Sequence, residues 1–305
     1  MTEEYKGKKI SGYFGLIIKV IISTLILYVL FSQFDIILLS EKIGKISRLK
    51  LALVVILGFI LWLTEYLRFY VTLKPVLHDG NIKLWRVFFS GYALRFVFPG
   101  GHGEVGKMLF VSGRYSQRVW AYLMDKGSFG LVVLISLIVS GWFYFPEHRV
   151  YFCLGFGLTV IFSVILLIVF RKRNVFTTNS RYPFHKILPP ALGLSVLQVM
   201  IITVQYWLIL YGENISIGVV FSTVCAILVV IMIPISFGGL GVREWTTLQI
   251  LKQFQVSREI AIITPLAVFF TNVLLPAIIG AGVIIFFKMK ISIPPKREAQ
   301  KCAKT

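Results

Sequence analysis

Long apolar runs separated by short polar segments make up most of the chain. A helix needs about 20 apolar residues to cross a hydrocarbon core that is about 30 Å thick. Runs of about this length lie at residues 13–31, 49–71, 119–145, 150–170, 190–211 and 260–287. The pattern therefore predicts an all-α polytopic membrane protein with about six transmembrane helices, three on either side of Pro146.

Two shorter apolar segments, residues 85–98 and 216–235, each end at a proline that closely spaced glycines follow. The breaks read FPGGHGEVGKM at residues 98–108 and PISFGGLGVRE at residues 234–244. Glycine and proline at this density break a helix. Broken backbone at membrane depth is tolerated only where protein or a water-filled cavity satisfies it. We therefore predict two re-entrant helical hairpins, each of which enters and leaves by the same membrane face.

The two halves of the chain then share one order: two crossings, a hairpin and a third crossing. Because three crossings are an odd number, the second half is expected to lie upside down relative to the first. Inverted repeats whose broken helices meet near the midplane are typical of transporters. We predict a single membrane domain, residues 1–305, with a first repeat at 12–146 and an inverted second repeat at 147–288. The alternative is chance, because any polytopic chain has proline and glycine breaks.

Basic residues gather in the N-terminal tail, in residues 171–186 and after residue 287. The positive-inside rule places such segments in the cytoplasm. We predict a multi-pass protein of the cell membrane with cytoplasmic termini and a short basic tail at residues 289–305. The net charge of +19 would indicate nucleic acid on a soluble protein. Since 57% of the residues are hydrophobic and the mean hydropathy is +0.83, we predict a membrane protein with no nucleic-acid partner.

The first break contains the spacing G-x-x-x-x-G-K, from Gly101 to Lys107, which resembles a phosphate-cradling P-loop. Met108 stands where a P-loop has Ser or Thr, and a membrane hairpin rather than a strand precedes it, so we do not expect ATP binding. A glycine-rich turn that opens a helix can still hold another anion through its free N–H groups.

We predict that the two breaks contact the phosphate of an anionic lipid headgroup. Basic side chains would supply charge, and glycines would supply backbone N–H groups; the candidates are Arg95, Lys107, Arg243, Gly101, Gly103, Gly239 and Gly241. The alternative is that the glycines only let helices pack closely, with Arg243 and Glu244 forming an interfacial pair.

Several charged residues fall near or within the predicted spans. A charge at a helix centre costs at least about 2.5–3.5 kcal/mol on insertion scales, so such residues usually face a bundle interior or a cavity. We assign gating or charge-coupling roles to Glu104, Glu244, Asp125, Lys126, Glu65 and Arg68. The alternative for Glu65 and Arg68, which share a helix face, is an interfacial pair at the cytoplasmic helix end. Polar Gln198, Gln205 and Asn272 are expected either to bond between helices or to line a cavity.

The motifs P-x-x-x-G-E-x-x-K at residues 99–107 and P-x-S-x-G-G-L-G-x-R-E at residues 234–244 resemble the lysylphosphatidylglycerol synthase transmembrane region, or flippase-like domain, family. The resemblance covers nearly the whole chain. It departs at Lys107, where the family usually has Arg, and at Asp125-Lys126, where it usually has Glu-Arg. It implies translocation of an anionic phospholipid or a polyprenyl-linked (glyco)lipid between leaflets. In longer members it implies a soluble aminoacyl-transfer domain; only residues 288–305 follow the last predicted span, so we expect no synthase activity.

The remaining chemistry is sparse. Cys153, Cys225 and Cys302 are far apart, and no Cys/His ligand cluster is present, so we expect no metal, cofactor or disulfide framework. We expect a transporter rather than an enzyme. One alternative is an enzyme that modifies a lipid headgroup within the membrane, with Glu104 and His102 as its acid–base pair. Another is a non-transporting envelope accessory protein. The sequence is compatible with a monomer and with a homo-oligomer.

Overall fold

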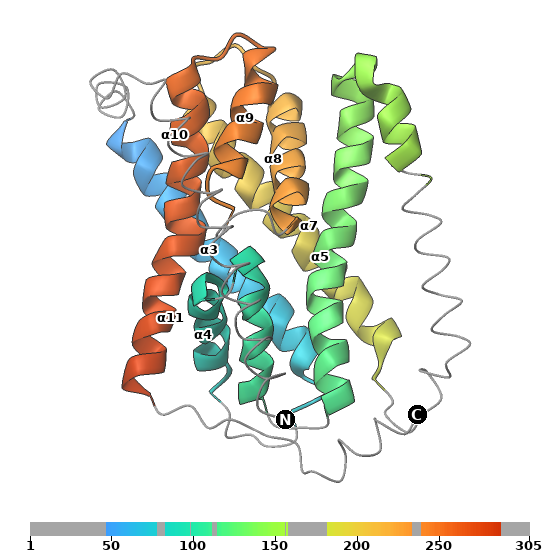
Figure 1. Cartoon of the computed structure of the whole chain (residues 1–305), viewed down its shortest axis with the longest axis vertical. Helices are drawn as coiled ribbons and strands as arrows, with labels where there is room; N and C mark the ends of the chain where they lie inside the picture. The colour runs from blue at the N-terminus through green and yellow to red at the C-terminus, as the bar shows by residue number, and fades with distance from the viewer. Residues whose placement is uncertain are drawn as a thin grey trace, which may run out of the picture.

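The structure, a computed structural model, describes residues 47–77, 83–97, 99–111, 115–155, 157, 182–233 and 239–287 of the 305-residue chain (Figure 1). These residues are helical, without β-strands, and they include four helices long and apolar enough to cross a membrane. The fold is therefore all-α and multi-pass. The predicted span at 13–31, most of the span at 150–170, the segment 234–238 and both basic tails lie outside the described residues.

The first half contains two long helices with a shorter pair between them. They are α3 (Arg48–Leu73), α4 (Leu84–Val97), the 3-10 helix η1 (Pro99–Phe110) and α5 (Tyr115–Tyr144), which the short η2 (Pro146–His148) follows. The predicted spans at 49–71 and 119–145 therefore correspond to α3 and α5, within a few residues.

The second half has the same order. Its elements are α7 (Phe184–Leu210), α8 (Ile217–Met232), α9 (Val242–Lys252), α10 (Arg258–Phe269), the π-helical turn η3 (Phe270–Leu274) and α11 (Leu275–Phe286). Ser216 caps α8, because its side chain accepts a hydrogen bond from the Val219 N–H. The predicted span at 260–287 is thus one continuous helical rod with a π-helical turn near its middle.

Each of the two segments predicted as hairpins contains two helices that pack against each other. In the first, α4 ends at Val97 and η1 returns alongside it. In the second, α9 returns along α8 after a turn in which Gly239 and Gly241 have φ of 79° and 82°, a left-handed conformation that glycine adopts readily. The pair α8 and α9 lies in the upper half of Figure 1, and α4 lies in the lower half.

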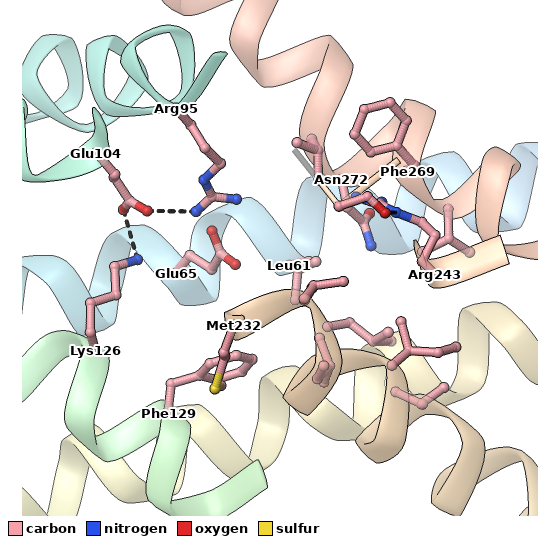
Figure 2. Close-up of a pocket in the computed structure, with 18 of the residues that line it drawn as sticks. Leu61, Glu65, Arg95, Glu104, Lys126, Phe129, Met232, Arg243, Phe269 and Asn272 are labelled. Atoms are coloured by element: carbon pink, nitrogen blue, oxygen red, sulfur yellow. Dashed lines mark hydrogen bonds and ion pairs between the residues drawn. The ribbon is translucent and has the colours of Figure 1, made fainter. Parts of the chain in front are cut away.

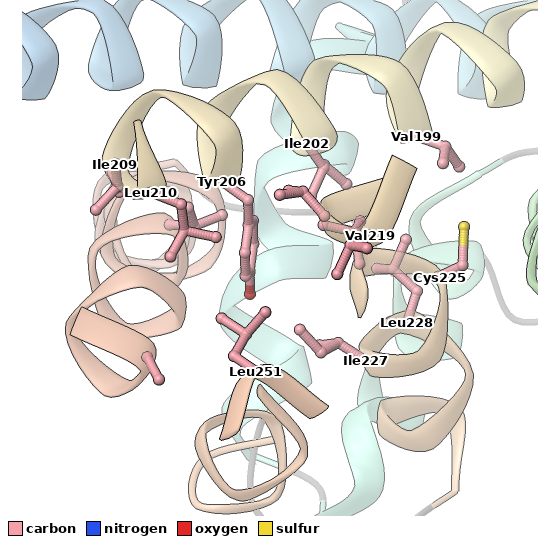
Figure 3. Close-up of a cluster of buried hydrophobic side chains, with 14 of the residues drawn as sticks. Val199, Ile202, Tyr206, Ile209, Leu210, Val219, Cys225, Ile227, Leu228 and Leu251 are labelled. Carbon is pink, nitrogen blue, oxygen red and sulfur yellow. The ribbon is translucent and has the colours of Figure 1, made fainter. Parts of the chain in front are cut away.

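Helices of the first half pack against helices of the second half. The helix α3 packs against α7, α5 packs against the hairpin helix α8, and α11 packs against the hairpin helix α4. One apolar cluster lies around α7, α8 and α9 and includes Tyr206, Val219 and Leu251 (Figure 3). A second surrounds α4, η1 and the end of α3 and includes Phe69 and Phe88. These two cores hold the hairpins in place on either side of a cavity.

Candidate functional site

A cavity of about 340 Å³ lies between the two hairpins. Side chains of both halves line it (Figure 2). Arg95, Glu104 and Lys126 stand at one end, and Arg243 stands at the other, beside Phe269. Between the two ends the wall is mostly apolar, with side chains such as Leu61, Phe129 and Met232.

Three cations converge on the carboxylate of Glu104, which η1 carries. Arg95 Nη2 lies 2.6 Å from Oε2, while Lys107 Nζ and Lys126 Nζ lie 2.6 and 2.7 Å from Oε1. Such short charge-assisted bonds are among the stronger hydrogen bonds in proteins. Gly91 on α4 makes room for this cluster, because a Cβ there would stand 2.8 Å from Lys107 Cδ.

Asp125 on α5 forms the second centre of the cluster. Its Oδ1 accepts a bond of 2.9 Å from Arg68 Nε, and its Oδ2 lies 3.7 Å from both Lys107 Nζ and Lys126 Nζ. Arg68 also donates to Gln198 Oε1 at 2.7 Å and to the Ser195 hydroxyl at 3.2 Å. The buried guanidinium therefore joins α3, α5 and α7.

Glu65 and Arg68 do not form the interfacial pair that was the alternative. Arg68 is 3% exposed and bonds Asp125, whereas Glu65 accepts a hydrogen bond from the Tyr92 hydroxyl of α4. Both Glu65 and Arg68 line the cavity. Their spacing of three residues put both on the cavity side of α3, but their partners come from other helices.

At the far end, Arg243 and Glu244 open α9. The Arg243 guanidinium carbon lies 4.2 Å from the centre of the Phe269 ring, and its Nε donates to the Gly239 carbonyl at 3.2 Å. Glu244 Oε2 accepts from the Gly241 N–H at 2.6 Å, so the carboxylate caps its own helix. Arg243 Nε lies 3.8 Å from Glu244 Oε1 and both residues are buried, which differs from the interfacial pair considered above.

The charged residues among the described lining are Arg68, Arg95, Lys126, Arg243, Glu65 and Glu104. Four of them are basic and two are acidic, so the lining carries a formal excess of two positive charges. A cleft lined by an excess of one sign of charge attracts ions of the opposite sign, so this cavity favours an anionic group.

The predicted site residues lie in different parts of the structure. The structure brings six of them, from α3, α4, η1 and α5, into one ion-pair network: Arg68, Arg95, Glu104, Lys107, Asp125 and Lys126. Arg243 and Gly239 lie across the cavity, and Gly241 precedes α9. Lys107 is 1% exposed and supports Glu104 from behind the lining. Gly101 and Gly103 lie within η1.

The polar residues Gln205 and Asn272 of the second half form hydrogen bonds between helices, which is one of the two roles expected for them. Gln205 and Asn272 exchange two amide bonds of 3.0 and 2.7 Å, and Gln205 also donates to the Val54 carbonyl. Asn272 also lines the cavity, so it both bonds between helices and contributes to the cavity wall. It lies in the π-helical turn, a feature that frequently marks functional sites.

Sequence reasoning missed Tyr92 and Phe269. Tyr92 stands three residues before Arg95 and therefore on the same helix face, a signal that was available. Phe269 had no comparable signal, because its contact with Arg243 depends on how α10 packs against α9. Across the described ranges, no group of three or more His, Cys, Asp or Glu side chains is placed to hold a metal. Cys302 and the side chain of His102 lie outside what the structure describes.

Comparison with known families gives one match. The family model described as lysylphosphatidylglycerol synthase TM region matches residues 16–280, which include every described helix except the end of α11. A search of curated proteins found no match.

Proposed function

We propose that this chain, which belongs to the lysylphosphatidylglycerol synthase transmembrane-region family, moves a lipid with an anionic headgroup between membrane leaflets. The observation that carries the proposal is the cavity between the two hairpins, with its excess of positive charge. Ionisable residues inside a membrane protein usually mark a substrate or ion pathway. The lipid is an anionic phospholipid or a polyprenyl-linked (glyco)lipid.

The proposed path takes the headgroup through the cavity while the acyl or polyprenyl chains stay in the bilayer. A cavity of about 340 Å³ is large enough for a small headgroup. The outer faces of the long helices are apolar; on α3, for example, Ile56, Phe59 and Leu63 are more than half exposed. These faces suit the lipid chains during the crossing.

Reciprocal packing supports an inverted repeat. The last helix of each half packs against the hairpin of the other: α5 against α8, and α11 against α4. The first helices of the halves, α3 and α7, pack against each other. A pseudo-two-fold axis in the membrane plane would produce this pattern, and the hairpins would then enter from opposite membrane faces. We therefore retain the re-entrant hairpins and the repeats at 12–146 and 147–288 as part of the proposal.

In this account Arg95 and Lys126 hold the headgroup phosphate at one end of the cavity, and Arg243 holds it at the other. The planar guanidinium of Arg243 suits two phosphate oxygens at once. The N–H groups of the two glycine turns contribute backbone donors. The burial of Lys107 behind Glu104 favours a supporting role over the direct phosphate contact predicted for it. We place the protein in the cell membrane with both termini in the cytoplasm, as its basic segments predict.

A transport assay tests the proposal. Vesicles with the purified protein hold fluorescent phosphatidylglycerol in both leaflets, and an impermeant reductant bleaches only the outer one. The native protein should expose the inner pool to bleaching. Loss of a charged hydrogen bond costs about 1.5–3 kcal/mol, so Lys126→Met and Arg243→Met should slow this movement about tenfold or more.

The matched controls are Lys252→Met and Arg149→Met, which remove exposed charges of the same kind and should leave the rate unchanged. Equal rates for the cavity variants and their controls would contradict the assignment of the site. Mass spectrometry of the recovered lipid adds a second readout, because a chemically altered headgroup would favour the enzyme alternative. A folded native protein that moves none of the anionic lipids offered would contradict the transport function.

A further inference from the structure

One carboxylate, Glu104, holds more cations than it can neutralise. Arg95, Lys107 and Lys126 all lie within 2.7 Å of its oxygens. Asp125 balances Arg68 and stands 3.7 Å from both lysines. The ion-pair network thus has four cations against two carboxylates, and Glu104 is its acidic member that lines the cavity. A third carboxylate, Glu65, lines the cavity near Arg95 and accepts a hydrogen bond from Tyr92.

The three partners of Glu104 differ in their access to the cavity. Lys107 is 1% exposed and lies three residues along the same segment, so it anchors the carboxylate from behind. Arg95 and Lys126 are 23% and 31% exposed at their side chains and line the cavity. These two cations can therefore reach either Glu104 or an anion in the cavity.

An exchange of one anion for another also keeps the two cations paired at all times. A cation left without a partner in a low-dielectric site is strongly unfavourable. The carboxylate of Glu104 gives Arg95 and Lys126 the close ion-pair contacts that phosphate oxygens would give them. Transport further requires binding weak enough for release, and a built-in competitor lowers the affinity for the passing anion.

From these observations, and resting on the proposed function, we infer that Glu104 is an internal stand-in for the lipid phosphate. Its carboxylate occupies Arg95 and Lys126 when the cavity is empty and yields them when a phosphate ester enters. The corresponding acid of the second motif, Glu244, does not have this role, because it caps α9 through the Gly241 N–H and does not line the cavity. The two motifs are alike in sequence, but only the first carries the stand-in.

Binding and transport should therefore change in opposite directions in Glu104→Gln. This variant removes the competing charge, so a soluble short-chain phosphatidylglycerol should bind about tenfold tighter, while transport of the long-chain lipid slows because release is slow. Titration calorimetry measures the first and the vesicle assay the second. The matched control is Glu147→Gln, which makes the same change at an exposed position and should alter neither.

A second variant covers the case in which Glu104→Gln does not fold. Glu104→Asp keeps the charge on a shorter side chain, so it competes less well and should bind the same probe with intermediate affinity. Weaker or unchanged binding in the folded variants overturns the inference. So does tighter binding of inorganic phosphate alone with the lipid unaffected. One further outcome separates the two proposals. If the native protein moves no lipid but the Glu104 variants bind the short-chain phosphatidylglycerol more tightly, the transport proposal is contradicted and the role of Glu104 as a phosphate stand-in is supported.

Discussion

The guanidinium of Arg68 on α3 and the carboxylate of Asp125 on α5 meet at 2.9 Å, with only 3% and 2% of their side chains exposed. The pair spans 57 residues of sequence and fixes two membrane-crossing helices beside the cavity. A buried ion pair adds little net stability when compared with apolar residues, but its disruption leaves one charge unmatched. The stability of the fold should therefore depend strongly on keeping both members of the pair.

Removing one member of this pair should be strongly destabilising. We expect Asp125→Asn to lower the free energy of unfolding by about 3–5 kcal/mol, because Arg68 keeps its charge without a carboxylate. The double variant Arg68→Met/Asp125→Leu should lose less than the sum of its single variants. Denaturant unfolding in mixed micelles, followed by the fluorescence of the six tryptophans, measures both. Additive losses would show that the two side chains are not coupled.

Two glycines of α11 should respond differently to substitution by alanine. A Cβ at Gly280 would stand 1.9 Å from the Phe89 carbonyl oxygen, whereas a Cβ at Gly282 meets nothing within 4 Å. Gly280→Ala must push α11 away from α4, a loss of about 1–3 kcal/mol or more. Gly282→Ala should be neutral or slightly stabilising, since alanine is the better helix former. Thermal unfolding of the two variants side by side checks this, and equal stabilities would contradict the close approach of α4 and α11.

The amide pair between Gln205 and Asn272 should show a modest coupling energy. Interhelical hydrogen bonds in membrane proteins average about 0.6 kcal/mol in double-mutant cycles and reach about 1.7 kcal/mol. We expect a value in the upper part of this range, because the two side chains exchange two bonds. The cycle needs Gln205→Ala, Asn272→Ala and the double variant, each measured by denaturant unfolding. A coupling of zero would mean that the two amides do not bind each other in the membrane protein.

Sequence reasoning located the long helices and the helix breaks well because both are local signals, whereas the re-entrant course of the two short helix pairs stays a prediction. Apolar length sets α3 and α5, and the proline–glycine breaks set the ends of α4 and α8. It also selected the charged residues, since charge within an apolar run is conspicuous. Sequence reasoning could not predict which of these charged residues form ion pairs with each other. That Arg68 binds Asp125, or that Glu104 collects cations from three segments, depends on how helices far apart in sequence pack. The approach of Gly280 to Phe89 likewise has no local signature.

The most direct test of the central claim, that a lipid headgroup crosses through the cavity, is to fill the cavity. Met232 lines it between its two charged ends (Figure 2), while Ile285 on α11 is 76% exposed. The vesicle assay with Met232→Trp and the control Ile285→Trp compares a bulky side chain in the path with one outside it. We predict that Met232→Trp stops the movement of fluorescent phosphatidylglycerol and that Ile285→Trp retains it. Movement at the native rate in a folded Met232→Trp protein would contradict the account.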